Sequence, residues 1–311
     1  MIFTIIGPIF LLLALGYLSV KLNIISKIQC ATVGSFVIKI ALPALFLQSL
    51  SAKNLSDIWF PKYFAVYGGV TFLMYVSAFF ILTHAFQNAK SDTAVLSLGA
   101  AMSNTGLIGT AVLTLLMGHQ ATMTYTSLVV ILESVFLIPT VLILAELFVK
   151  KEEAVNVTKI ITSTLLTLVK NPLFMGVMLG IIFAIYQIKL PSQLDQILLM
   201  LGQTASPLAL FSIGGGIVGL SLKYVNIQSF YLVLSSNILM PLLVYLGLRY
   251  LTDVSIEMVH AGTLIASLPM PTIFAILGQA YGLNEKTLTP LLMSNIVGFI
   301  GMSCLITLWW T

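Results

Sequence analysis

Charged residues are scarce in this sequence. Only 8% of its 311 residues are charged, whereas 59% are hydrophobic and the mean hydropathy is +1.08. A soluble protein carries roughly 25% charged residues, so the composition excludes a soluble fold and indicates an integral membrane protein. We interpret the net charge of +4 as a bias of the membrane loops and predict no nucleic-acid partner.

Cysteine is nearly absent as well. Cys30 and Cys304 both lie in or beside apolar segments, and their spacing does not match a metal-ligand motif. Two such isolated residues exclude a cysteine-based metal centre, and we predict no metal site. We expect both to be small buried hydrophobic side chains.

Motifs of intramembrane enzymes are also missing. Such a protease needs two aspartates, a Ser/His pair or an HExxH zinc motif within the bilayer. The sequence contains no HExxH and no P-loop, and its aspartates fall in predicted loops or at their boundaries: Asp57, Asp92, Asp195 and Asp253. We therefore predict a protein that is not an enzyme, has no cofactor and draws its energy from an ion gradient or from exchange.

Long apolar segments, by contrast, are plentiful. A membrane-spanning helix needs about 20 mainly apolar residues, and runs such as IFLLLAL do not alternate as barrel strands would. The apolar N-terminus has no basic leader, so we interpret it as the first span. The pattern predicts an all-α membrane protein with spans at residues 1–20, 29–50, 61–86, 92–117, 122–148, 165–186, 193–220, 227–250, 256–280 and 286–310.

Basic residues predict how these ten spans are oriented. Cytoplasmic loops are enriched in Lys and Arg. With the N-terminus outside, the cytoplasmic loops hold Lys21, Lys27, Lys90, Lys150, Lys151, Lys159, Lys170, Lys223 and Lys286. The opposite side holds only Lys53, Lys62, Lys189 and Arg249. We therefore predict a multi-pass protein of the cytoplasmic membrane with both termini extracytoplasmic.

The two halves of the chain share features at matching positions. Pro43 and Pro207 are as many positions apart as Gly118 and Gly282, and the same offset aligns Thr105-Gly106-Leu107 with Pro269-Met270-Pro271. Because each half has five spans, the second copy enters the membrane upside down. We predict a five-plus-five inverted repeat of residues 1–149 and 165–311, joined by a cytoplasmic loop at 150–164.

The aligned segments interrupt spans 4 and 9. Proline lacks an N–H group and clashes with the preceding helical turn, while Gly106 and Gly109 relax the backbone. Broken helices at corresponding positions of two repeats indicate a transporter's binding site, because half-helix N-termini direct N–H groups at an anion. Simple kinks, which are common in membrane helices, remain the alternative.

Four segments together resemble the auxin efflux carrier family along essentially the whole chain. They are ALPALF, SNTGLIG, KNPLFMGVMLG and SLPMPTIFAILGQAYG. The family includes the PIN-type plant auxin exporters and bacterial malonate and malate permeases. The resemblance implies two inverted repeats with unwound, crossing helices 4 and 9, as in bile-acid sodium symporters. It also implies a scaffold, a transport bundle and elevator-like transport of organic anions.

The resemblance also assigns site residues. Plant members carry Asn-Pro-Asn-Thr-Tyr in helix 4, and Asn104-Thr105 matches the Asn-Thr pair. Ser103 replaces the proline and Gly106 the tyrosine, so the resemblance does not support an aromatic ligand contact. The short central loop is similar to the bacterial branch. The substrate-binding residues expected are Asn104, Thr105, Gly106, Pro269, Met270 and Pro271, with Pro43, Pro207 and Gly109 as helix breaks or hinges.

Polar side chains within the spans complete the predicted site. An ionisable group in a membrane span is by default a functional hypothesis. Lys39 either neutralises a carboxylate substrate, pairs with an acid or reaches toward the membrane boundary, and Glu133 is either a proton site, a partner for Lys39 or a protonated interhelical group. Asn295 is a weaker candidate.

Taken together, the sequence predicts a secondary transporter of small mono- or dicarboxylates such as malonate or malate. We predict H⁺ or Na⁺ as the coupling ion and the lipid bilayer as its surroundings, and we leave open a homodimer. An exporter of indole acids is one alternative. An anion channel or a membrane receptor, neither of which alternates access, is the other.

Overall fold

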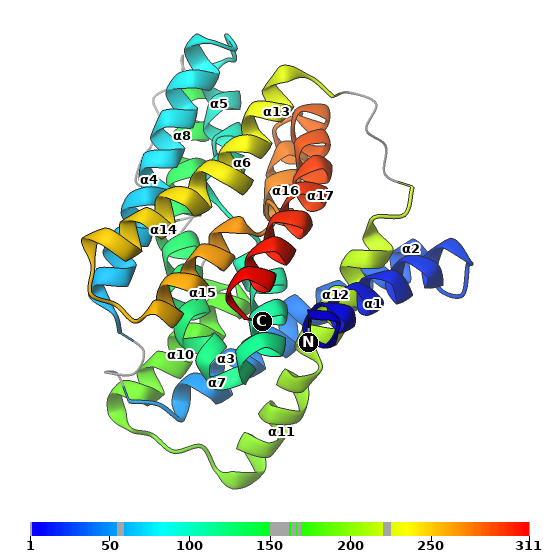
Figure 1. Ribbon diagram of the computed structural model, residues 1–311, viewed down its shortest axis with the longest axis vertical. Helices are drawn as coiled ribbons and strands as arrows, with labels where there is room; N and C mark the ends of the chain where they lie inside the picture. The colour runs from blue at the N-terminus through cyan, green and yellow to red at the C-terminus, as the bar shows by residue number, and fades with distance from the viewer. Residues whose placement is uncertain are drawn as a thin grey trace.

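The structure is a computed structural model that describes residues 2–54, 59–149, 162, 166, 169–219 and 225–310 (Figure 1). The predicted connecting loop at 150–164 lies, apart from residue 162, outside these residues, as does Lys223. Every regular element of the described chain is helical, which confirms the prediction of an all-helical protein. The helices are α1 (Ile2–Lys21), α2 (Lys27–Phe36), α3 (Leu42–Ser51), α4 (Pro61–His84), α5 (Lys90–Leu96), α6 (Leu98–Ala101), α7 (Thr110–Ile131), α8 (Ile138–Val149), α10 (Pro172–Tyr186), α11 (Ser192–Gln203), α12 (Ala205–Gly216), α13 (Ile227–Leu234), α14 (Met240–Leu251), α15 (Ile256–Ser267), α16 (Thr272–Ala280) and α17 (Asn284–Trp309).

Seven helices of the described chain are long and apolar enough to cross a membrane. They are Lys27–Ser51, Pro61–His84, Lys90–Phe148, Ser192–Gly216, Ile227–Leu251, Ile256–Gly278 and Asn284–Trp309. Two shorter apolar helices, Phe10–Lys21 and Pro172–Tyr186, accompany them. These lengths fit a multi-pass membrane protein, as the composition predicts.

The segment Lys90–Phe148 is far too long for one crossing. It has 59 residues, and a straight helix of that length would extend roughly 90 Å, about three times the hydrocarbon core. It is not straight, because Gly118 has φ 78° and ψ 170°. Glycine adopts such a left-handed conformation without strain. The turn lies between the predicted spans 92–117 and 122–148.

In the described part of the chain, π-helical turns interrupt the α-helical hydrogen bonding at η1 (Val37–Ala41), η3 (Thr105–Gly109), η4 (Leu132–Leu137) and η5 (Ser235–Leu239). Three of them end two residues before a proline, namely Pro43, Pro139 and Pro241. Proline removes an N–H donor and clashes with the carbonyl four residues earlier, and a wider turn accommodates that carbonyl. The helix is therefore continuous at Pro43, whereas α11 and α12 are divided at Thr204, just before Pro207.

The helices form two bundles. In the small bundle α12 packs against α1 and α2, and α3 packs against α10 and α11. In the large bundle α4 and α15 pack against α14, α8 packs against α5, and α17 packs against α13 and α16. Figure 1 shows α1, α2 and α12 lying beside the large bundle. Contact between the bundles is made mainly by η3 and α7, which touch α12, α3 and α10.

Glycine allows the small bundle to pack at backbone contact. A Cβ atom on Gly16 of α1 would lie 1.9 Å from the carbonyl oxygen of Phe211 in α12, and one on Gly214 would lie 1.9 Å from that of Leu13. No side chain fits at such distances. Close approach through small residues is the usual way in which membrane helices associate.

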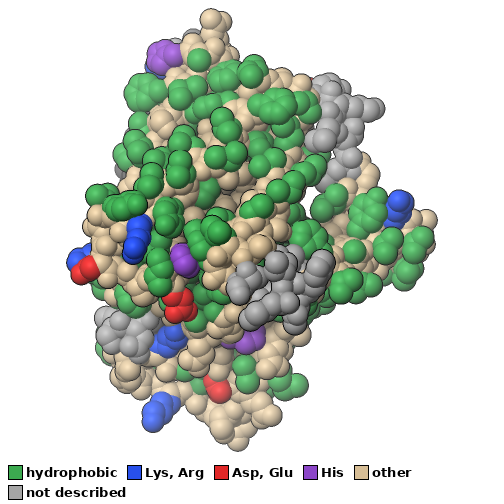
Figure 2. Space-filling model, in the orientation of Figure 1, with side chains coloured by type: hydrophobic (Ala, Val, Ile, Leu, Met, Phe, Trp, Pro, Cys, Tyr) green, Lys and Arg blue, Asp and Glu red, His purple; other side chains and the backbone are tan. Residues whose placement is uncertain are grey.

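The outer surface is as apolar as the composition implies. Figure 2 shows hydrophobic side chains spread over most of one face, with few charged ones among them. Cys30 is buried between α2 and α12, as expected, but the same expectation for Cys304 is wrong because this side chain is exposed. Cys304 lies with Tyr245 and Trp309 along an outward-facing apolar groove, where a membrane protein tolerates a small apolar side chain.

Candidate functional site

The first helix break lies where the sequence places it. Helix α6 ends at Ala101, and Met102 has extended dihedral angles of φ −127° and ψ 137°. Asn104 is also non-helical, with φ −81° and ψ 58°, and the helix resumes at Thr105 as η3. The carbonyl oxygen of Asn104 accepts hydrogen bonds from the N–H groups of Ile108 and Gly109, at 3.0 and 2.9 Å.

The second break separates α15 from α16. Leu268 is extended, with φ −62° and ψ 157°, and residues 269–271 are non-helical. Pro269 and Pro271 remove two N–H donors from this segment, so the helix cannot continue through it. Pro269, Met270 and Pro271 are all buried, whereas Thr272, the first residue of α16, is exposed.

The two breaks are in direct contact. The N–H of Asn104 donates a hydrogen bond of 2.9 Å to the carbonyl oxygen of Pro269. Nearby, a Cβ on Gly109 would lie 2.9 Å from a methyl carbon of Leu268, so glycine leaves room for the second break. The segments predicted as spans 4 and 9 therefore meet at their non-helical residues. At each break, backbone N–H and C=O groups that an intact helix would pair internally can bind other partners.

Side chains of neighbouring helices form hydrogen bonds with the backbone groups of the second break. Asn237 in η5 donates to the carbonyl oxygens of Ser267 and Leu268, at 3.2 and 3.1 Å. Ser294 in α17 accepts the Met270 N–H at 2.9 Å and donates to the Asn237 side-chain oxygen at 2.7 Å. The sequence prediction named Asn295 instead, which is half-buried and lies one residue from the group that makes the contact.

Glu133 lies beside the first break. The hydroxyl of Thr105 donates to its carboxyl oxygen at 2.9 Å, and the Ser103 and Thr105 hydroxyls are 3.2 Å apart. Glu133 is only 3% exposed. No ion pair joins it to Lys39, whose exposed side chain projects from η1 between Ile38 and Ile40. The structure thus places Glu133 at the contact between the two breaks at Asn104 and Pro269, which we call the crossover. Lys39 lies at the surface.

The polar groups that remain open at the crossover suit an anion. Asn104 and Gly106 are half-buried, and the Asn104 carboxamide makes no hydrogen bond within the described chain. Because Ile108 and Gly109 bind the Asn104 carbonyl, the N–H groups of Gly106 and Leu107 remain at the open helix N-terminus. A helix N-terminus with free N–H groups favours negative charge.

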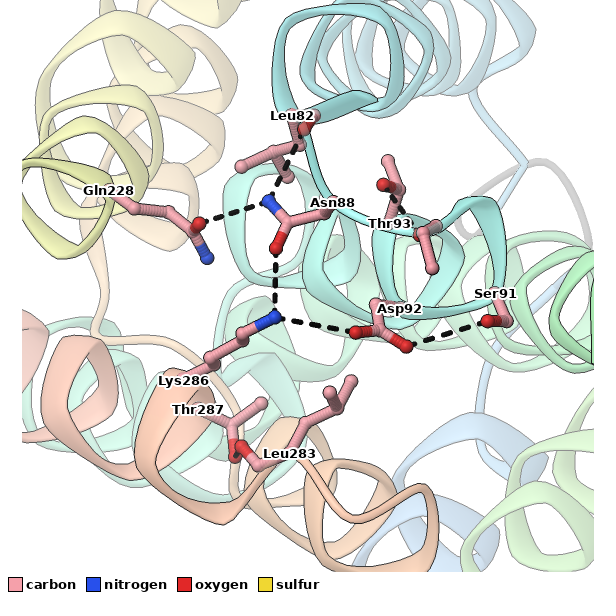
Figure 3. Close-up of polar contacts among 10 residues, drawn as sticks. Leu82, Asn88, Ser91, Asp92, Thr93, Gln228, Leu283, Lys286 and Thr287 are labelled. Atoms are coloured by element: carbon pink, nitrogen blue, oxygen red, sulfur yellow. Dashed lines mark hydrogen bonds and ion pairs between the residues drawn. The ribbon is translucent and has the colours of Figure 1, made fainter. Parts of the chain in front are cut away.

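A separate polar cluster joins three helix ends (Figure 3). Lys286 at the start of α17 binds Asn88 at 2.9 Å and Asp92 of α5 at 3.3 Å. Asn88 in turn donates to Gln228 of α13 at 3.0 Å. At the opposite end of α4, Lys62 pairs with Asp253 at 2.5 Å. These contacts tie ends of the large bundle together and lie apart from the crossover.

Comparison with known proteins agrees with this picture. The chain is 25% identical over 293 residues to a "Putative malonate transporter" of Rhizobium meliloti, covering 93% of this chain and 90% of that protein. It is 23% identical to "Uncharacterized transporter YfdV" of Escherichia coli, covering 94% and 92%. A "Lysosomal cholesterol signaling protein" of Mus musculus matches at 28% identity over 66% of this chain and 24% of its own length.

A family model described as "Membrane transport protein" matches residues 1–309, nearly the whole chain. The resemblance to the auxin efflux carrier family is thereby confirmed. This chain belongs to the membrane transport protein family, to which the auxin efflux carriers also belong.

Proposed function

We propose that this chain is a secondary active transporter of small organic anions, mono- or dicarboxylates such as malonate or malate. The observation that carries the proposal is the contact between two broken helices at Asn104 and Pro269. Paired breaks of this kind form substrate sites in secondary transporters. A relative named as a malonate transporter, similar over 93% of this chain, supports the substrate class.

In this proposal the anion binds at the half-helix N-terminus that begins with Thr105. The N–H groups of Gly106 and Leu107 and the Asn104 carboxamide donate to its carboxylate. The exposed Thr272 at the start of α16 borders the second break and suits a second carboxylate. Pro269, Met270 and Pro271 shape the site through their backbone, since all three side chains are buried.

We further propose ten crossings arranged as an inverted repeat. Gly118 and Gly282, which the sequence aligns, have φ values of 78° and 72°. The same offset relates Gly16 to Gly180. Just as a Cβ on Gly16 would meet a backbone carbonyl of α12, a Cβ on Gly180 would lie 3.1 Å from the carbonyl oxygen of Phe46 in α3. Equivalent glycines serving equivalent contacts favour two copies of one unit.

The two bundles suggest how the site changes sides. We assign the small bundle as scaffold and the large bundle, which holds both breaks and Glu133, as the moving part. The crossover lies at the boundary, because a Cβ on Gly106 would be 3.1 Å from Leu173 of α10 in the small bundle. Sliding the large bundle along this boundary would expose the site alternately, which is elevator-type transport.

The proposal places the protein in the cytoplasmic membrane with both termini outside, coupled to H⁺ or Na⁺, and assigns it no enzymatic activity. The replacement of the plant family's tyrosine by Gly106 favours small anions over indole acids. An anion channel is the competing class, because a channel opens one continuous path and needs no exchange of conformations.

Counterflow distinguishes transporter from channel. Purified protein is reconstituted in liposomes loaded with unlabelled malonate, and uptake of labelled malonate is followed. We expect internal malonate to accelerate this uptake, because a carrier returns faster when loaded. Uptake that is independent of internal malonate at equal membrane potential would favour the channel. Indole acetate in place of malonate tests the auxin-like alternative.

A further inference from the structure

Glu133 is a buried carboxyl group beside the proposed anion site, and anion binding alone does not explain its presence there. Within the described chain no Lys, Arg or His forms an ion pair with it, and it is 3% exposed. Its one hydrogen bond to a side chain comes from the Thr105 hydroxyl. An ionised carboxylate buried without a cation is strongly unfavourable, and such a group takes up a proton instead.

Its position makes that proton sensitive to the substrate. The Thr105 hydroxyl donates a hydrogen bond to the Glu133 carboxyl group, and Thr105 is next in the sequence to Asn104, the proposed anion ligand. An anion held there adds a second negative charge close to the carboxyl group. Like charges at one site disfavour ionisation, so bound anion and bound proton stabilise each other. This coupling is reciprocal by thermodynamic necessity.

A row of tyrosines leads away from Glu133. Tyr67 of α4 lies beside Glu133 and Ser103, and its ring centroid is 5.9 Å from that of Tyr63. Tyr63 neighbours both Glu133 and Tyr125 of α7. The hydroxyl groups of Tyr63 and Tyr67 are fully buried; that of Tyr63 has no hydrogen-bond partner in the described chain, and that of Tyr67 faces Ser103. A buried hydroxyl without a partner is rare, and a path for protons or water along the row would account for the one on Tyr63.

The row ends at a hollow in the protein surface. Tyr125 lines this hollow, which has a volume of about 460 Å³, together with Lys62, Asp253 and Ser255. Lys62 holds the pKa of the Asp253 carboxyl below its usual value through their hydrogen bond, so Asp253 stays ionised there. Glu257 is a further charged group near Tyr125. The charge count predicts this end of the molecule to face the outside.

We propose that Glu133 is the proton-binding site of a proton–anion symporter, reached from the outer surface through Tyr125, Tyr63 and Tyr67. The inference rests on the organic-anion function above. One proton from outside joins the Glu133 carboxylate and converts it to a carboxylic acid when the anion binds. After the site faces the cytoplasm the anion leaves, the acid ionises, and the same proton departs on that side.

Infrared spectroscopy of the purified protein tests the proton site without any substrate. A protonated-carboxyl band should be present at low pH and should disappear as the pH is raised, because the carboxylic acid then ionises. We expect the band to be lost in Glu133→Gln and retained in Glu146→Gln, a matched control in α8 whose carboxyl accepts from Tyr281. A band that survives in Glu133→Gln would overturn the proposal.

Malonate binding at several pH values tests the coupling. In the wild type we expect affinity to fall by up to about tenfold per pH unit above the Glu133 titration, since bound anion carries one proton. Glu133→Gln should bind malonate with little pH dependence, because its amide mimics the acid. An unchanged pH slope in this variant would reject the coupling. If the wild type showed the carboxyl band but did not bind malonate, this result would count against the proposed function instead.

The route has its own test. Tyr67→Phe removes only a hydroxyl and should slow proton-driven malonate uptake several-fold while leaving malonate affinity unchanged. Tyr75→Phe is the matched control, because its buried hydroxyl lies on the same helix but donates to the Ala94 carbonyl at 3.0 Å, away from the row. Equal slowing in the two variants would show that Tyr67 acts only through packing, and would overturn the route.

Discussion

At the scale of single residues, Asn104 and Asn237 illustrate two uses of one side chain. Asn104 places its backbone in the contact between the breaks, and its carboxamide makes no hydrogen bond to any residue that the structure describes. The Asn237 carboxamide instead donates hydrogen bonds to the carbonyl oxygens of Ser267 and Leu268. Sequence position alone could not separate them, since both are asparagines within apolar segments.

Replacing Asn104 should therefore impair transport without destabilising the fold. For Asn104→Ala we expect malonate uptake into proteoliposomes to be abolished, while the free energy of unfolding changes by less than about 0.5 kcal/mol, as for a side chain without structural contacts. Uptake and thermal unfolding in detergent are measured on the same preparation. A parallel loss of both would make Asn104 a packing residue.

The opposite pattern is expected for Asn237→Ala. Its removal leaves the carbonyls of Ser267 and Leu268 and the Ser294 hydroxyl without their partner inside the protein. An unsatisfied buried polar group costs about 1–3 kcal/mol, so the unfolding temperature should drop clearly. If stability were unchanged, water would have to replace the amide, and the bracing role assigned to Asn237 would be wrong.

At the scale of helices, Pro and Gly determine where the regular pattern stops. Pro43, Pro139 and Pro241 each follow a π-helical turn and leave the helix continuous, whereas Pro269 and Pro271 together leave four residues extended or irregular. A single proline removes one donor, which a wider turn accommodates, but two prolines in three residues exceed what one turn can absorb. The helix is accordingly continuous at Pro43, so a hinge there stays a prediction.

Gly118 offers a test at this scale. Its φ of 78° strains any L-residue, although a Cβ there would meet no atom within 4 Å. We expect Gly118→Ala to lower the free energy of unfolding by about 1–2 kcal/mol through backbone strain alone. Gly301→Ala is the control, because that site is helical and equally open, and it should be neutral or slightly stabilising. Equal unfolding temperatures for the two variants would contradict the strain argument.

At the scale of the whole molecule, the two bundles meet mainly at η3 and α7, and pairs of side chains on other helices also join them. One such pair is Phe10 of α1 and Phe299 of α17, whose ring centroids are 6.4 Å apart. Within the large bundle, Phe86 and Tyr231 are similarly close, at 5.6 Å. A covalent link across the first pair restrains one bundle against the other, whereas a link across the second does not.

Elevator transport predicts different outcomes for these two links. In a background lacking Cys30 and Cys304, a short cross-linker applied to Phe10→Cys/Phe299→Cys should abolish counterflow, and cleaving the link should restore it. The same treatment of Phe86→Cys/Tyr231→Cys should leave counterflow intact, because both residues move together. Full counterflow in the first cross-linked variant would mean that the bundles do not slide.

The sequence by itself determined the helical membrane fold, the family and the position of both breaks. Apolar runs of about 20 residues form helices in lipid, because a helix pairs its own backbone N–H and C=O groups. Pro269, Pro271 and Gly106 change the local backbone conformation, and this effect can be predicted from the residue type alone. Only the tertiary structure decided which polar groups meet: Ser294 in place of Asn295 at the second break, Glu133 on Thr105, and Lys39 at the surface. Those contacts depend on how helices far apart in the chain rotate and pack against one another. A single sequence indicates where each helix forms, but it does not indicate which helix packs against which.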